Sequence, residues 1–132
     1  MILDASAIVA ILRSEAGAQH LVDAMLAAPA IALSSVTMLE ARMAMLGRFG
    51  PAAIAELDTL LRDIQAEEVP FDSRQSHLAF EAFRRYGKGS GHPARLNLGD
   101  CAAYALATSR DAPLLFKGDD FRATDVRDAL AG

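Results

Sequence analysis

The chain has 132 residues, of which 52% are hydrophobic, and its formal net charge at pH 7 is −4. This length and composition are typical of one domain that buries a core without staples, so we expect residues 1–132 to form a single domain. Cys101 is the only cysteine, which excludes an internal disulfide and a cage of thiolate metal ligands. A reducing cytoplasm fits this composition best.

Two further features bear on location and partners. The N-terminal residues carry no basic leader, and no apolar run approaches the roughly 20 residues that a bilayer span needs. We therefore expect a soluble, cytoplasmic protein with no membrane partner. The acidic balance of the whole chain disfavours nucleic acid as a ligand, because phosphate backbones attract basic surfaces. A nucleic acid would have to be held by cations gathered locally.

Short apolar segments alternate with longer helical patterns along the chain. The first half predicts a strand over 1–3, helices over 5–12 and 17–27, a strand over 30–33, and a helix opened by Ser34 or Ser35 and ending near Gly47 or Gly50. The second half predicts a helix from Pro51 with an apolar stripe up to Ile64, a brief strand around Val69, a helix from Ser73, a Gly-rich loop over 87–93, a helix over 98–109 and a buried strand over 113–116. The segment 125–130 is ambiguous.

This alternation predicts an α/β fold with three layers, in which a central, mainly parallel sheet carries helices on both faces. In such sheets, ligands bind at the carboxyl ends of the strands. Four acids lie at strand ends or early in helices that can reach the same edge: Asp4, Glu40, Asp100 and Asp119. We expect these four carboxylates to converge and to form the catalytic group.

Any one of these acids can instead cap a helix or occupy a turn. As a group, close carboxylates repel one another unless a divalent cation neutralises them. Oxygen-only ligands favour Mg²⁺, with Mn²⁺ possible, and Mg²⁺ usually takes only one or two carboxylates directly. Asp4 and Asp100 are therefore the expected metal ligands, while Glu40 and Asp119 act through water or at a second metal position. Such an ion holds a phosphodiester oxygen and activates water, which predicts phosphodiester hydrolysis.

Four segments of the chain resemble the PIN-domain family, specifically its VapC-type toxins. They are Met-Ile-Leu-Asp-Ala-Ser-Ala-Ile at 1–8, Ser-Ser-Val-Thr-Met-Leu-Glu at 34–40, Leu-Asn-Leu-Gly-Asp-Cys at 96–101 and Leu-Leu-Phe-Lys-Gly-Asp-Asp-Phe at 114–121. The resemblance spans essentially the whole chain. It implies a metal-dependent endoribonuclease that is the toxin of a type II toxin-antitoxin pair, is inhibited by a VapB-like antitoxin and is usually dimeric. It also implies RNA cleavage that leaves a 3′ hydroxyl and a 5′ phosphate.

The same resemblance assigns roles to individual residues. It carries the metal ligands of the family over to Asp4 and Asp100. Ser6 matches the small hydroxyl residue beside the first acid, and we expect it to orient that acid or a water. The fourth acid of the cluster is Asp119 or its neighbour Asp120, and Asp119 is preferred.

An acidic pocket holds RNA only when cations surround it. The run 84–95 has basic side chains and no acids, and it supplies the RNA-binding candidates Arg84, Arg85, Lys88 and Arg95. Its ordinary interpretation is a solvated loop. Three other cations lie closer in sequence to the acids and either contact phosphate or pair with those acids: Arg13, Arg42 and Lys117. Four methionines either line a groove for an antitoxin helix or pack in the core: Met25, Met38, Met43 and Met45.

Two other classes of protein compete with this interpretation. A receiver-like phosphoacceptor signalling domain also has a parallel sheet, an acidic Mg²⁺ pocket and a late lysine, which Lys117 would supply. That class needs an acid pair after the first strand, where Asp4 stands alone, and an acceptor aspartate after the middle strand, whereas Asp58 lies in a helical pattern. The second competitor is a catalytically inactive PIN-like binding module, which the retention of all four acids disfavours.

Overall fold

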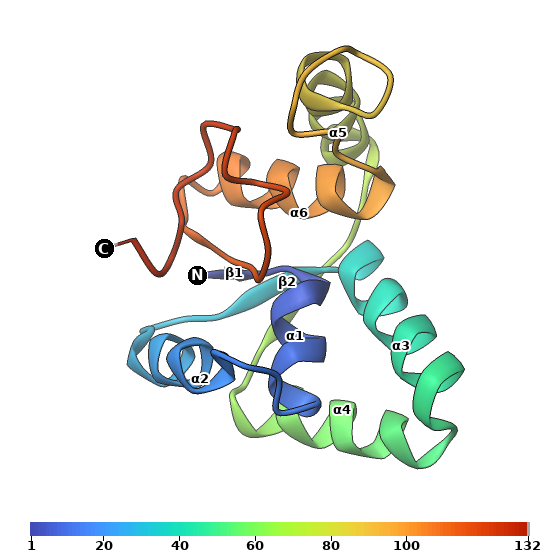
Figure 1. The fold of residues 1–132 in the computed structure, drawn as a ribbon, viewed down its shortest axis with the longest axis vertical. Coiled ribbons are helices and arrows are strands. Elements are labelled where there is room, and N and C mark those ends of the chain that lie inside the picture. Colours follow the sequence, from blue (N-terminus) through green and yellow to red (C-terminus); the bar gives the residue numbers. More distant parts are fainter. Residues whose placement is uncertain (132) are drawn as a thin grey trace.

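Four parallel strands form the centre of the protein in the computed structural model, which describes residues 1–131 (Figure 1). The strands are β1 (Ile2–Leu3), β2 (Ala32–Ser34), β3 (Glu67–Val69) and β4 (Leu114–Leu115). Their order in the sheet is β3-β2-β1-β4, and every pairing is parallel. The first strand of the chain therefore lies inside the sheet, between β2 and β4.

Six helices cover the two faces of this sheet. They are α1 (Ala5–Leu12), α2 (Ala18–Ala27), α3 (Ser35–Phe49), α4 (Ala52–Asp63), α5 (Ser73–Tyr86) and α6 (Leu98–Ser109). In Figure 1, α5 and α6 lie on one side of the sheet and α1 to α4 lie on the other. The predicted three-layer α/β architecture with a parallel sheet is confirmed.

The strands β1 and β4 are apolar at every position because helices cover both faces of the sheet there. Neighbouring residues of a strand point to opposite faces. Ile2 and Leu114 belong to the core beneath α5 and α6, whereas Leu3 and Leu115 belong to the core beneath α1, α2 and α4. Both residues of β1 and both residues of β4 are therefore buried, one on each face of the sheet.

The ends of α3 and the start of α4 follow from single residues. Ser34 caps α3, and its hydroxyl accepts a hydrogen bond from the Val36 N–H at 3.1 Å. Gly50 ends α3 with φ +79°, a left-handed value that glycine adopts without strain. Pro51 then begins α4, where its missing N–H is no loss.

The buried face of α3 differs from the face that its apolar residues suggest. The helix packs against α1, α4 and α6, and it buries Thr37, Ala41 and Met45. Leu39 and Met43 instead lie in solvent, with exposed fractions of 58% and 64%. Thr37 and Ala41 are small side chains at two of the three buried positions, so the neighbouring helices approach closely there while Leu39 and Met43 face outward.

The four methionines divide in the same way. Met25 and Met45 are core residues and Met38 is partly buried, so only Met43 of the four is largely exposed. Core packing is therefore the role of at least half of them.

The segment after β4 returns to the edge of that strand and forms a parallel bridge with it. Leu114 donates its N–H to Arg127 O at 2.8 Å, and Ala129 donates its N–H to Leu114 O at 2.9 Å. The ambiguous segment 125–130 thus covers the open edge of β4 with turns and a single bridge between Leu114 and Asp128. Within residues 1–131, no helix combines the length and apolar character needed to cross a bilayer.

Candidate active site

Asp4 follows β1 directly and caps α1. Its Oδ2 accepts hydrogen bonds from the Ser6 N–H at 3.0 Å and from the Ser6 hydroxyl at 2.5 Å. Its Oδ1 is buried and has no hydrogen-bond partner among residues 1–131. Burial raises the pKa of this carboxyl group, against the effect of the Ser6 hydrogen bonds. A buried carboxylate oxygen without a partner costs stability, so this atom is suited to a cation.

Ser6 joins Asp4 to the end of β4. Its hydroxyl donates to Asp4 Oδ2 and accepts a hydrogen bond from the Lys117 N–H at 3.0 Å. Both hydrogen-bonding functions of the hydroxyl are thereby used within the protein. This geometry fits the expected role of Ser6 in orienting the acid.

Asp100 lies in the first turn of α6 and forms a capping box with Asn97. The Asp100 N–H donates to Asn97 Oδ1 at 2.9 Å, and Asp100 Oδ2 accepts from the Asn97 N–H at 3.1 Å. Burial raises the pKa of Asp100 to about 6, and the charges of Asp4 and Asp120 add to the rise. Capping occupies Oδ2, which leaves Oδ1 to serve as a ligand. Capping and metal binding are therefore compatible at this residue.

Glu40 reaches the same place from α3. Its carboxyl group lies against Gly99, where a Cβ atom built on the glycine would come within 2.5 Å of Glu40 Cδ. Burial raises the pKa of Glu40 to about 7, with further contributions from the charges of Asp4 and Asp100. Carboxylates from three separate elements are thus close enough to interact. Gly99 makes room for one of them, and sequence reasoning did not single it out.

The structure places Asp119 apart from this group. Asp119 points away from the other acids, with a side chain that is 91% exposed and pairs with Arg122 at 2.8 Å. Asp120 instead lines the same pocket as Asp4, Glu40 and Asp100, and its charge raises the pKa of Asp4 and Asp100. The turn after β4, with Gly118 at φ +98°, directs the second of the two adjacent acids toward the cluster.

The acids line a pocket of about 440 Å³ at the carboxyl edge of the sheet. Five acids and two cations face it, since Glu15, Arg48 and Lys117 join the cluster residues. Lys117 Nζ pairs with Glu15 Oε1 at 2.8 Å. Arg48 was not among the sequence candidates, although it follows Glu40 by about two helical turns and so shares its side of α3. The acids that face the pocket therefore outnumber the cations.

A model of the PIN domain family matches residues 1–127 of the chain. The chain belongs to the PIN-domain family. Ribonuclease VapC42 of Mycobacterium tuberculosis is 46% identical to it over 129 residues, which cover 98% of each chain. Ribonuclease VapC of Mycolicibacterium smegmatis is 44% identical over 126 residues, which cover 96% of this chain and 97% of that protein. The resemblance seen in the four sequence segments is confirmed.

Solved structures show the same fold for this PIN domain. Mycobacterium tuberculosis VapC20, a toxin that cleaves the Sarcin-Ricin loop, superposes with a TM-score of 0.78 and 13% identity over 95% of both chains. VapBC2 from Rickettsia felis, bound to a DNA fragment from the promoter of its genes, gives a TM-score of 0.73 and 16% identity. That match covers 96% of this chain and 94% of the other. These matches exclude the receiver-like alternative.

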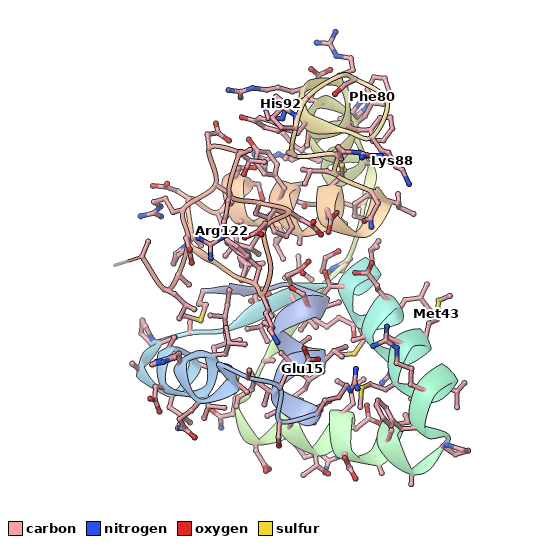
Figure 2. All side chains as sticks on the ribbon, viewed as in Figure 1. Glu15, Met43, Phe80, Lys88, His92 and Arg122 are labelled. Atoms are coloured by element: carbon pink, nitrogen blue, oxygen red, sulfur yellow. The ribbon has the colours of Figure 1, made fainter. Side chains whose placement is uncertain are left out.

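The other cations considered from the sequence lie elsewhere on the PIN domain. Arg84 pairs with Glu81 at 3.0 Å, Arg85 pairs with Asp125 at 3.4 Å, and Lys88 and Arg95 are exposed. None of these four lines the acidic pocket in the described residues 1–131, and Figure 2 shows Lys88 next to α5. Their contact with RNA stays a prediction.

The two early arginines already have partners in the protein. Arg42 pairs with Asp58 at 3.1 Å, while Arg13 lies over the Phe49 ring and 3.9 Å from Glu15. Neither partner is one of the four acids predicted to form the cluster, so the pairing expected from the sequence is not the one that the structure shows. Contact of the two arginines with phosphate stays a prediction.

The donor set of the pocket fits a hard divalent cation. The cluster offers only oxygen donors, and Asp4 contributes a buried oxygen that no group in residues 1–131 satisfies. In this part of the chain, no group of three His, Cys, Asp or Glu side chains is arranged closely enough to hold a metal ion. Mg²⁺ is commonly bound by one or two carboxylates and several waters, so two direct ligands are sufficient.

The stability gained from Mg²⁺ is expected to be larger at about pH 8 than at about pH 5. The pKa values of Glu40 and Asp100, about 7 and about 6, exceed the ordinary values of 4.5 and 3.8. Between these limits the folded protein holds more protons than the unfolded chain, so the unfolding free energy of the metal-free protein falls as pH rises. A cation offsets that loss, and thermal unfolding with and without Mg²⁺ measures it. An equal gain at both pH values would contradict the expectation.

Proposed function

We propose that this PIN domain is a divalent-metal-dependent endoribonuclease that hydrolyses RNA phosphodiester bonds as the toxin of a toxin-antitoxin pair. One observation carries the proposal: the buried Oδ1 of Asp4, which has no hydrogen-bond partner within residues 1–131, lies in a pocket with Glu40, Asp100 and Asp120. The relatives of the chain are named VapC ribonucleases, which supports both the reaction and the substrate.

Asp4 and Asp100 would hold the cation, Mg²⁺ first and Mn²⁺ as the alternative. Such an ion, when bound, attracts a phosphate oxygen and stabilises the negative charge that develops during hydrolysis. Ser6 keeps Asp4 oriented through its two hydrogen bonds. Asn97 does the same for Asp100 through the capping box. Both ligands are thus held before substrate arrives, which reduces the cost of ordering them.

Glu40 and Asp120 would orient the attacking water. Glu40 is the proposed acceptor of a proton from that water, because it is half-buried, its charge interacts with those of Asp4 and Asp100, and its pKa of about 7 suits a general base. Arg48 and Lys117 supply positive charge for the phosphates on either side of the reacting group. The proposed products are a 3′ hydroxyl and a 5′ phosphate.

We also propose a VapB-like antitoxin as partner, a homodimeric toxin and a cytoplasmic location. A solved toxin-antitoxin complex from Klebsiella pneumoniae shares the fold with a TM-score of 0.64, which supports the antitoxin. The buried free thiol of Cys101 and an RNA substrate fit the cytoplasm. Purification of the protein from its native host, followed by identification of any small protein that remains bound, tests the partner.

Asp120→Asn is expected to lower kcat/KM for RNA cleavage about tenfold or more, which corresponds to a rise of about 1.4 kcal/mol or more in the activation barrier. Asp119→Asn is the matched control, because the neighbouring acid has its side chain in solvent and paired with Arg122. The assay follows a labelled RNA with Mg²⁺ and with EDTA, and it identifies the new 5′ ends. The opposite result for the two variants would return the role to Asp119. RNA binding without metal-dependent cleavage would instead show an inactive binding module.

A further inference from the structure

A second hollow adjoins the acidic pocket across the turn at Lys117 and Gly118. Its volume is about 560 Å³, within the range of roughly 300–1,000 Å³ that small-molecule sites occupy. It is walled by the start of α2, by the turn and by the C-terminal segment. Lys117 and Gly118 line both hollows. An RNA strand that passes from the acidic pocket over this turn would enter the second hollow directly.

The two hollows differ in charge. The acidic pocket has more acids than cations, whereas the second hollow is lined by Lys117, Arg122, His20 and the acid Asp128. Its two cations are paired at its edge with the partly or fully exposed acids Glu15 and Asp119. The second hollow therefore attracts a phosphate that flanks the reacting group more strongly than the acidic pocket does. Figure 2 shows Glu15 and Arg122, which line the acidic pocket and the second hollow respectively.

Arg122 is available to a ligand even though it has a partner. Its side chain is 66% exposed, and its ion pair with Asp119 lies in solvent. Such exposed pairs contribute little stability. A guanidinium group binds a phosphate through two parallel hydrogen bonds, so exchange of Asp119 for a phosphate is favourable.

The turn between the hollows carries no side chain at Gly118, and its backbone is hydrogen-bonded to Ser6. Gly118 has φ +98°, and a Cβ atom at this position would meet nothing within 4 Å. The Lys117 N–H donates to the Ser6 hydroxyl, which in turn donates to Asp4. The backbone that the two hollows share is thus linked by hydrogen bonds to the proposed metal ligand Asp4, which sets the second hollow beside the reacting group.

We propose that the second hollow is a subsite for the nucleotide next to the cleaved phosphodiester, with Arg122 and Lys117 on its phosphate and His20 against its base. Stacking on a histidine ring is a usual mode of recognition for unpaired bases. The proposal rests on the proposed function, because the same RNA strand must pass over the acids. It adds a place where the nucleotide beside the cut is held.

Arg122→Gln tests the phosphate contact, and Arg127→Gln is its matched control. Arg127 is similarly exposed at 60%, pairs with an exposed acid, Asp111, and lines neither hollow. The probe is a short single-stranded RNA of random sequence, bound in Mg²⁺ to Asp100→Asn protein so that cleavage is suppressed. Arg122→Gln is expected to weaken binding about fivefold and to reduce the slope of log K against log salt by about 0.7. Arg127→Gln should change neither quantity by more than about twofold.

A fluorescence measurement tests the base contact separately. The chain contains no tryptophan, so His20→Trp introduces a single indole at the hollow. RNA is expected to quench its emission, and His77→Trp, on an exposed position of α5 that lines neither hollow, should remain unchanged.

The outcomes separate the subsite from the function. If the wild type cleaves RNA while Arg122→Gln binds normally or the indole at position 20 stays unquenched, the subsite is wrong and the nuclease stands. If the protein neither binds nor cleaves RNA, both proposals are overturned.

Discussion

Asp4→Asn is expected to lower kcat/KM for RNA cleavage on the order of 10³-fold, because the loss of a metal-binding carboxylate removes several kcal/mol of transition-state stabilisation. The same change should raise the unfolding midpoint of the metal-free protein. Burial raises the pKa of Asp4, so the charged form costs stability in the absence of a cation. An asparagine oxygen still accepts the capping hydrogen bond from the Ser6 N–H. A lower kcat/KM together with a higher unfolding midpoint would show that the Asp4 carboxylate serves the reaction and not the stability of the fold.

Asp72→Asn provides the control for this experiment. Asp72 caps α5 in the way that Asp4 caps α1, accepting the Gln75 N–H at 3.0 Å, but it lies on the surface outside the pocket. This variant should cleave RNA as the wild type does. Cleavage rates under single-turnover conditions and calorimetric unfolding with EDTA measure both effects. Wild-type turnover by Asp4→Asn would remove Asp4 from the proposed centre.

Gly99→Ala is expected to lower cleavage roughly 10- to 100-fold, equivalent to about 1.4 to 2.7 kcal/mol in the barrier, without loss of stability. The added Cβ would overlap the Glu40 carboxyl group, which must then leave its place beside Asp4 and Asp100. The backbone of Gly99 is helical, so alanine favours the fold by up to about 1 kcal/mol. The substitution is thus expected to lower activity by displacing Glu40, although Gly99 has no side chain of its own.

Gly47→Ala is the matched control, since Gly47 also lies inside a helix but a Cβ there would meet nothing within 4 Å. A double-mutant cycle with Glu40→Gln assigns the cause. If Gly99 acts only by making room for Glu40, Gly99→Ala should cost little once Glu40 is already changed. Losses that multiply in full would show that Gly99 acts on something other than Glu40. Calorimetric titration with Mn²⁺ gives a second readout that does not depend on turnover.

The elements that sequence reasoning located well are those whose residues are buried on every side. The strands β1 and β4 are apolar throughout because helices cover both faces of the sheet, so their position is visible in the residue order. Their exact bounds were less visible, since the predicted strand 113–116 has only Leu114–Leu115 in the ladder. The outward face of α3 could not be foreseen for a related reason. Burial there depends on how closely α1 approaches Ala41, and not on which residues are largest.

The candidate site was foreseen in part for the same kind of reason. Asp4 and Asp100 were recognisable because each begins a helix at the carboxyl edge of the sheet, where ligands bind. The choice between Asp119 and Asp120 depends on the backbone angles of a turn, which two adjacent identical residues do not reveal. The importance of Gly99 could have been predicted from the sequence, because a glycine inside a helical pattern usually has a packing or functional reason.

The hydroxyl of Ser6 links Asp4 to the backbone of Lys117 through two hydrogen bonds. Displacement of the backbone at Lys117 is therefore a route to inhibition. A partner that pulled on the chain after β4 would also draw Asp4 away from Asp100 and Glu40. The nuclease could then be silenced from its C-terminal segment, with the acids themselves left uncovered.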